Sequence, residues 1–189
     1  RTGNRGPLYA ALMAAAWLLC HAYALFFHTI GDPIWLTIIL ILIQVWLYTG
    51  LFIVARDTMH GSFAPKNKAL NDWTGRIILF WYAGFNWDSM RTAHHQHHAT
   101  PGTADDPDFN ADNPHAFWPW YLKFFVEYFS WKQIVILSGI SLIYLLLGAP
   151  YPNLVVMWAV PAILSSVQLF YFGTYLTHRH SGPFVDEHL

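Results

Sequence analysis

The sequence predicts an all-α integral membrane protein, with four transmembrane helices in two hairpins and a cytoplasmic cap of interfacial helices. Its composition is the first observation behind this fold class, because 55% of the 189 residues are hydrophobic and only 11% are charged. Soluble domains carry about a quarter charged residues. The second observation is a set of four apolar segments near the length of about 20 residues that crosses a bilayer. They are residues 8–27, 34–55, 133–149 and 154–176.

Each apolar segment is expected to be a helix, because backbone groups in lipid have no water to bind. No charged residue occurs in 34–55 or in 133–177. Short turns that contain Gly and Pro, at 28–33 and 148–153, join the segments pairwise into hairpins. The run 8–27 is long for the core of a signal peptide, and no small-residue cleavage site follows it, so we interpret it as a span.

The basic residues predict the orientation. If the N-terminus is cytoplasmic, every Lys and Arg falls on the cytoplasmic side, and the external turns carry only Asp32. This is the positive-inside pattern. The net charge of −1 gives no basic surface for nucleic acid. The basic residues are Arg1, Arg5, Arg56, Lys66, Lys68, Arg76, Arg91, Lys123, Lys132 and Arg179.

The cap is the segment 56–132, between the second and third spans. It contains two short apolar stretches, 77–85 and 116–131, and the second is interrupted by proline and charged residues. Both stretches suit helices in the membrane interface, where Trp and Tyr keep one polar edge in water. The chain 1–189 is therefore predicted to be a single membrane domain whose functional groups lie in the cap.

Histidine is unusually frequent in this chain, which contains eleven. His94, His97 and His98 have the i, i+3, i+4 spacing that places side chains on one helix face, whereas His95 points elsewhere. His60 and His178 follow directly after the second and fourth spans, so both are delivered to the same membrane face. Imidazoles in such a group suit Fe, Zn or Cu. The alternative is a solvated, partly cationic loop, but the sequence favours a metal site.

Several acids accompany these histidines. Asp57 either fixes the tautomer of a ligand imidazole or is a solvated acid at a helix end. Asp105, Asp106 and Asp108 are either ligand or orienting carboxylates or turn formers, and position favours function for Asp106 and Asp108. Arg56, one helical turn before His60, has no lone pair and is not a ligand. The remaining histidines are weaker candidates: His115, His180, His188, and His21 as a hydrogen-bonded intramembrane group.

The stretches RDTMHG, YAGF, HHQHH, PGTADDPDF and FGTYLTHRH resemble the bacterial β-carotene ketolases of the integral-membrane di-iron fatty-acid desaturase superfamily. The resemblance implies an O2-dependent oxygenase of the bacterial inner membrane that converts the C4 methylene of β-ionone rings to a ketone, taking β-carotene to echinenone or canthaxanthin. It implies two iron ions, an external electron donor such as ferredoxin, and a carotenoid substrate in the lipid. The implied iron ligands are His60, His94, His97, His98 and His178, assisted by Asp57, Asp106 and Asp108.

The chain departs from the family pattern at two places. The family opens its first histidine cluster as H-D-x-M-H, and Arg56 stands where the first histidine is expected. The family also continues beyond PFVDEHL (183–189) to a third cluster of the H-x-x-H-H kind. We therefore expect a domain truncated at both ends that is inactive as an isolated fragment.

Other functions stay open at this stage. A membrane fatty-acid or lipid desaturase and a carotenoid hydroxylase share the histidine clusters, and only PGTADDPDF and FGTYLTHR favour the carotenoid ketolase. A histidine-rich metal transporter belongs to another class, but transporters place polar groups at mid-membrane, and the last three spans have almost none. A non-catalytic paralogue is kept open by Arg56.

Overall fold

The computed structural model describes residues 5–179, and within this range all regular secondary structure is helical. This result confirms the predicted all-α class. Six helices precede one long, composite helix. They are α1 (Arg5–Phe26), α2 (Ile34–Met59), α3 (Lys68–Ala83), α4 (Trp87–Ala99), α5 (Phe117–Tyr128) and α6 (Trp131–Leu146), followed by α7 (Tyr151–Asn153), η1 (Leu154–Ala159), α8 (Val160–Phe170), η2 (Tyr171–Tyr175) and α9 (Leu176–His178).

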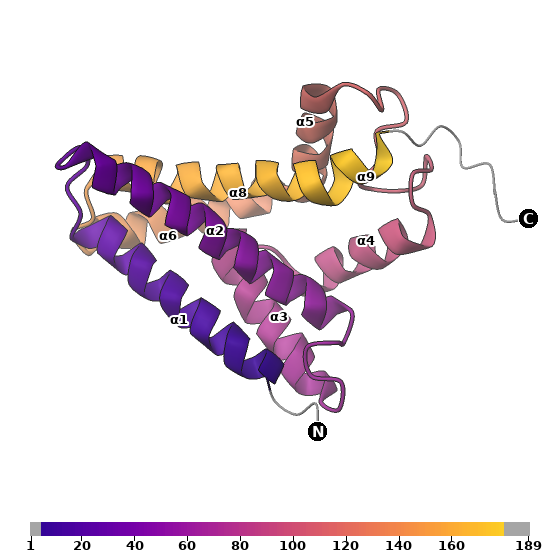
Figure 1. Cartoon of the computed structure of the whole chain (residues 1–189), viewed down its shortest axis with the longest axis horizontal. Coiled ribbons are helices and arrows are strands. Elements are labelled where there is room, and N and C mark those ends of the chain that lie inside the picture. Colours follow the sequence, from indigo (N-terminus) through magenta and orange to yellow (C-terminus); the bar gives the residue numbers. More distant parts are fainter. Residues whose placement is uncertain (1–4, 180–189) are drawn as a thin grey trace, which may run out of the picture.

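The long helices form two hairpins, α1 with α2 and α6 with the composite helix α7–α9 (Figure 1). Both hairpin turns lie at one end of the molecule, and α4, α5 and α9 lie at the other, which we call the histidine end (Figure 1). Helix α2 is central, because it packs against α1, α3 and α8. The two hairpins were predicted from the apolar segments and their Gly- and Pro-containing turns.

Within residues 5–179, three helical stretches are long and apolar enough to cross a membrane: Gly6–Phe26, Ile34–Met59 and Tyr151–His178. A fourth span is possible only if α5 and α6 count together, and they meet at a bend of 76°. Helix α6 alone has 16 residues, which corresponds to roughly 24 Å of helix. The predicted span 133–149 corresponds to α6, which by itself is shorter than the about 20 residues that cross a bilayer.

Ser130 explains where α6 begins. Its hydroxyl accepts a hydrogen bond from the backbone N–H of Lys132, and Gln133 Oε1 accepts one from the Ser130 N–H at 3.0 Å. This reciprocal arrangement is a capping box, which starts a new helix and satisfies its free N–H groups. The break lies close to the predicted boundary between the cap, 56–132, and the span 133–149.

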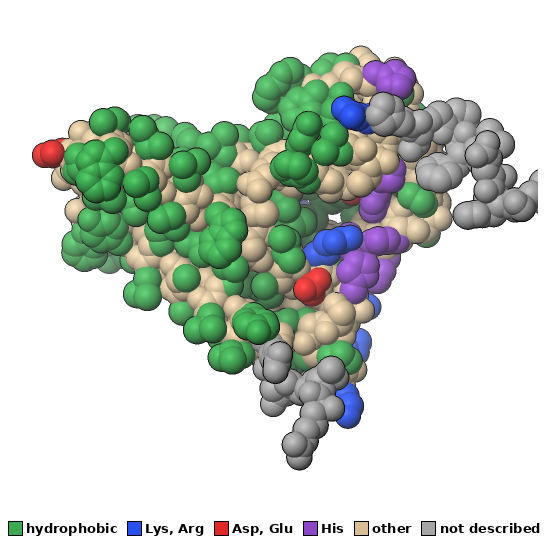
Figure 2. All heavy atoms as spheres, viewed as in Figure 1, with side chains coloured by type: hydrophobic (Ala, Val, Ile, Leu, Met, Phe, Trp, Pro, Cys, Tyr) green, Lys and Arg blue, Asp and Glu red, His purple; other side chains and the backbone are tan. Residues whose placement is uncertain are grey.

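The surface agrees with a membrane environment. Large apolar side chains are exposed along the bundle, whereas basic and histidine side chains gather at the histidine end (Figure 2). Inside the bundle, His21 lies 3.4 Å from Gln44 Oε1 and 3.3 Å from the Tyr144 hydroxyl. This observation confirms that His21 is a hydrogen-bonded intramembrane group. Isolated polar groups in hydrocarbon need such partners.

Helix α3 supports the histidine-bearing α4. It begins earlier than the predicted interfacial stretch 77–85, because the Asn67 side chain accepts a hydrogen bond from the Leu70 N–H at 2.9 Å. Trp87, the first residue of α4, is buried against Gly75, where a Cβ would lie 2.0 Å from the indole ring. Both guanidinium nitrogens of Arg76 donate to Asp88 at 2.9 Å. These contacts fix the start of α4 relative to α3.

Candidate metal centre

Two groups of side chains at the histidine end each bring three ligand atoms within 4.8 Å of one another. The first cluster is His60, His94 and His98, and the second cluster is His97, Asp106 and His178. The first joins the end of α2 to α4, and the second joins α4 to the following loop and α9. The end of α2, the loop after α4, and α9 therefore converge on α4.

In the first cluster, the Nε2 atoms of His60 and His94 are 2.9 Å apart. The His98 ring centroid lies 4.6 Å from that of His94 and 4.9 Å from that of His60. Burial, followed by the charges of nearby histidines and Arg56, lowers the pKa of His94 to about 3. Burial also lowers the pKa of His60 and of His98. The cluster therefore favours neutral imidazoles, the form that binds a metal ion.

The second cluster contains an oriented histidine. His97 donates from Nδ1 to the carboxylate of Asp106, at 2.9 Å from Oδ1 and 3.1 Å from Oδ2. Its Nε2 atom is then the free nitrogen, and its ring centroid is 5.4 Å from that of His178. A carboxylate that fixes the tautomer of a ligand histidine is the usual arrangement around protein-bound metals. The hydrogen bond to Asp106 also raises the pKa of His97.

Asp106 is itself fixed in place. The carboxylate is buried and accepts hydrogen bonds from the backbone N–H groups of Gly102 and Asp108, both at 2.8 Å. Burial alone would raise the pKa of Asp106, but the hydrogen bonds from His97, Gly102 and Asp108 lower it. The loop PGTADDPDF therefore holds an ionised carboxylate against His97, a contact that the functional alternative for Asp106 requires and a plain turn former would not make.

Helix α4 divides the three histidines that the spacing grouped together. His94 and His98 face His60, whereas His97 faces His178. The rings of His97 and His98 remain 5.5 Å apart, so the two clusters are neighbours. A π-helical turn, η2, lies directly before α9 and its His178, and such turns frequently accompany functional sites.

The other candidates lie outside both clusters. The carboxylate of Asp57 is exposed and makes no hydrogen bond within residues 5–179, although its charge acts on His60. His95 is also exposed, in agreement with its predicted direction. The side chain of His115 donates to the Arg179 carbonyl at 3.1 Å. His180 and His188 lie outside the described residues.

A cavity of about 630 Å³ adjoins both clusters, since His94 and His97 line it together with Arg56 and Asp108. Most of its remaining wall is apolar. The aliphatic and aromatic lining includes Phe52, Ile53, Met59, Phe85, Met90, Phe124, Phe125, Phe129, Leu169 and Phe172.

Tyr128 is a cavity residue that the sequence did not indicate. Its hydroxyl donates to Asp108 Oδ1, and Asp108 Oδ2 lies 3.6 Å from His97 Nδ1. Burial raises the pKa of Asp108, although the hydrogen bond from Tyr128 acts in the opposite direction. Tyr128 lies in an aromatic stretch in which nothing distinguishes it from the anchoring aromatic residues around it.

The structure combines apolar helices of membrane-spanning length with two histidine-containing clusters that could each hold a metal ion, beside a largely apolar cavity. Residues 32–138 match the fatty acid desaturase family. The chain belongs to that family, in the group that contains the bacterial beta-carotene ketolases. No solved structure matches the chain.

Three relatives document this placement. The chain is 43% identical to a beta-carotene ketolase of Paracoccus sp. strain N81106 over 176 residues, which cover 92% of this chain and 71% of the relative. It is 37% identical to the beta-carotene ketolase of Paracoccus sp. strain PC1, over 98% of this chain and 75% of the relative. It is 34% identical to a zeaxanthin 4-ketolase of Chlamydomonas reinhardtii, over 95% of this chain and 42% of the relative.

Proposed function

We propose that this protein is a β-carotene ketolase that oxidises the C4 methylene of β-ionone rings to a ketone with O2. One structural observation carries the proposal: the apolar cavity is lined by a histidine from each cluster, His94 and His97. A hydrocarbon ring held there has its carbon atoms beside both candidate metal positions. The names of the Paracoccus relatives supply the substrate.

The proposed cofactor is a pair of iron ions. The residues fit such ions, because five imidazoles stand in two adjacent groups and one of them is oriented by a buried carboxylate. His60, His94 and His98 would hold one ion, and His97 and His178 the other. When bound, iron supplies the activation of O2 that no side chain provides. We propose that an external donor such as ferredoxin supplies the electrons.

The chain's own residues position the substrate. The aromatic wall of the cavity excludes water and holds a ring by apolar contact, while the long polyene remains in lipid. Asp106 accepts a hydrogen bond from His97 Nδ1, which leaves Nε2 of His97 for the metal ion. Tyr128 and Asp108 join α5 to the loop after α4 and close the wall beside His97.

We further propose that the protein lies in the bacterial inner membrane with its histidine end in the cytoplasm. The support is the distribution of charge, because the Lys and Arg side chains visible in Figure 2 lie on the histidine side. Cytoplasmic segments of membrane proteins carry an excess of such residues. An electron donor of the cytoplasm would then reach the clusters directly.

The complete gene, expressed in a host that accumulates β-carotene, tests this function. We expect echinenone or canthaxanthin on chromatography, and neither from His97→Ala made in equal amount. Ketone-free extracts from well-expressed wild-type protein would contradict the proposal. A changed fatty-acid profile without new pigment would instead support the lipid desaturase alternative.

A further inference from the structure

We propose that the two clusters bind metal ions with unequal affinity: the second cluster fills first, and Arg56 weakens the first cluster. This inference rests on the proposed metal centre and deepens it. It follows from the charges around each cluster, which differ in sign.

Arg56 lies in the last turn of α2, four residues before His60 of the first cluster, and it lines the cavity together with His94 and His97. Its charge acts on the imidazoles of His60, His94 and His98, which is the whole first cluster. Within residues 5–179, no carboxylate oxygen lies within the 4.0 Å of an ion pair with Arg56. A guanidinium has no lone pair to offer, so Arg56 opposes a cation in the first cluster without coordinating it.

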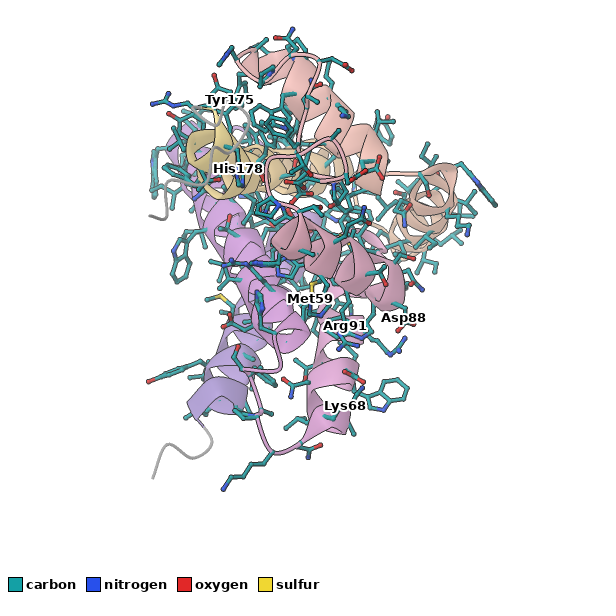
Figure 3. The ribbon with its side chains drawn as sticks, turned by 90° about the vertical axis from the view of Figure 1, so that its right-hand side faces the viewer. Met59, Lys68, Asp88, Arg91, Tyr175 and His178 are labelled. Carbon is teal, nitrogen blue, oxygen red and sulfur yellow. The ribbon has the colours of Figure 1, made fainter. Side chains whose placement is uncertain are left out.

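A second guanidinium lies on the same side. Arg91, on α4, lines a small polar pocket of about 240 Å³ that also contains His60 and His95. Figure 3 shows Arg91, Met59 and Lys68 below α4 in that view, with His178 above it. Lys68 is already paired with Asp72. The exposed carboxylate of Asp57 is the acid that acts in the opposite sense on His60.

The second cluster has the opposite electrostatic environment. Asp106 is 3% exposed and hydrogen-bonded to His97. The carboxylate of Asp108 lies 3.6 Å from the same imidazole nitrogen. Two carboxylates therefore stand beside His97, and they attract a dication. Because carboxylates attract a metal ion at the second cluster and Arg56 repels one at the first, we expect the second cluster to bind a metal ion first.

The size of the effect follows from Coulomb's law. A dication and a guanidinium several ångström apart in water-like surroundings repel each other enough to weaken binding by about tenfold. Arg56, His60 and His98 are exposed, so the water-like value applies. Removing the charge of Arg56 is therefore expected to strengthen binding at the first cluster by about tenfold.

Metal titration of the complete gene product, purified in detergent and stripped of metal, tests the inference. The probe is Co²⁺, with bound metal counted by elemental analysis after equilibrium dialysis. In wild-type protein we expect one tight equivalent and a second that binds at least about tenfold more weakly. His178→Ala should remove the tight equivalent, and His98→Ala the weak one.

Two substitutions at position 56 isolate the charge. Arg56→Met removes the charge without adding a ligand and should strengthen the weaker equivalent about tenfold, whereas Arg56→Lys keeps the charge and should leave it unchanged. Thermal unfolding of each variant shows that it is folded. Equal affinities in wild-type protein, or no gain in folded Arg56→Met, would overturn the inference.

This result is separable from the proposed function. Unequal cobalt affinities in a protein that forms no ketone would sustain the inference and contradict the ketolase assignment. Ketone formation by a protein that binds two cobalt ions with equal affinity would support the ketolase assignment and contradict the inference. Absence of bound cobalt in wild-type protein and in every variant would overturn the inference together with its metal centre.

Discussion

The Nδ1 atom of His97 lies 2.9 Å from Oδ1 of Asp106, and this contact leaves Nε2 as the nitrogen available to a metal ion. Asp106 is in turn fixed by two backbone N–H groups of its own loop. The contact joins the loop PGTADDPDF to α4, so one hydrogen bond connects the two most distinctive sequence stretches of the chain. If this contact orients His97, removing the charge of Asp106 should weaken metal binding.

Asp106→Asn should weaken metal binding at the second cluster. The amide keeps an acceptor oxygen but loses the negative charge, and loss of such an orienting partner typically costs 10–100-fold in metal affinity. Cobalt titration of the purified variant measures the change. Asp105→Asn is the matched control, because that neighbouring side chain is exposed and belongs to neither cluster. Equal losses in both variants would contradict the role of Asp106.

Gly75→Ala should destabilise the protein and displace α4. The added Cβ would lie 2.0 Å from the Trp87 ring, and overpacking of this kind costs about 1–3 kcal/mol in free energy of unfolding. Thermal or denaturant unfolding in detergent measures the loss. Gly139→Ala in α6 is the control, since its Cβ would meet nothing within 4 Å. A Gly75→Ala protein as stable as Gly139→Ala would show that Trp87 does not anchor α4.

Arg56→His should raise both bound iron and ketone yield. It removes the cation beside the first cluster and places an imidazole four residues before His60, on the same helix face. Iron content of the purified variant and pigment extracted from its host measure the two effects. Arg56→Gln separates loss of charge from gain of a ligand. Unchanged iron content in Arg56→His would show that position 56 does not contact the metal site.

Tyr128→Phe should lower ketone yield while metal content stays close to that of wild-type protein. The substitution leaves the buried carboxylate of Asp108 without its hydroxyl donor, and a buried group that loses its partner costs about 1–3 kcal/mol in stability. Pigment yield, metal content and unfolding are compared with Tyr151→Phe, an exposed tyrosine at the opposite end. Loss of metal in Tyr128→Phe would instead make the tyrosine part of the metal site.

Hydrophobicity and basic residues predicted the helical class, the two hairpins and the end of the bundle that carries the histidines. They placed the start of the third span at residue 133, and α6 begins close to it, at Trp131, where Ser130 and Gln133 form a local cap. They did not show that α2 continues to Met59, one turn past the predicted boundary at residue 55. The apolar segment ends at residue 55 because Arg56 is charged, whereas the helix itself continues to Met59.

The histidine spacing predicted that His94, His97 and His98 lie on one face of a helix. It did not predict how these three histidines divide between the two clusters. His94, His97 and His98 share a broad face, and the assignment of each depends on the neighbours that tertiary structure brings to it. His60 arrives from α2 and His178 from α9, on different sides of α4. The sequence contains no local signal for these directions, and it contains none for Tyr128. The catalytic or orienting role of Asp57 stays a prediction.

Ketone formation by the purified, complete protein tests the central claim most directly. The assay supplies β-carotene in detergent micelles, O2, a ferredoxin with its reductase, and protein either loaded with iron or stripped by a chelator. We predict a 4-keto product from iron-loaded wild-type protein, restored by iron after stripping, and none from His97→Ala. Ketone from stripped or His97→Ala protein, or its absence from folded, iron-loaded wild-type protein, would contradict the assignment of the chemistry to these two clusters.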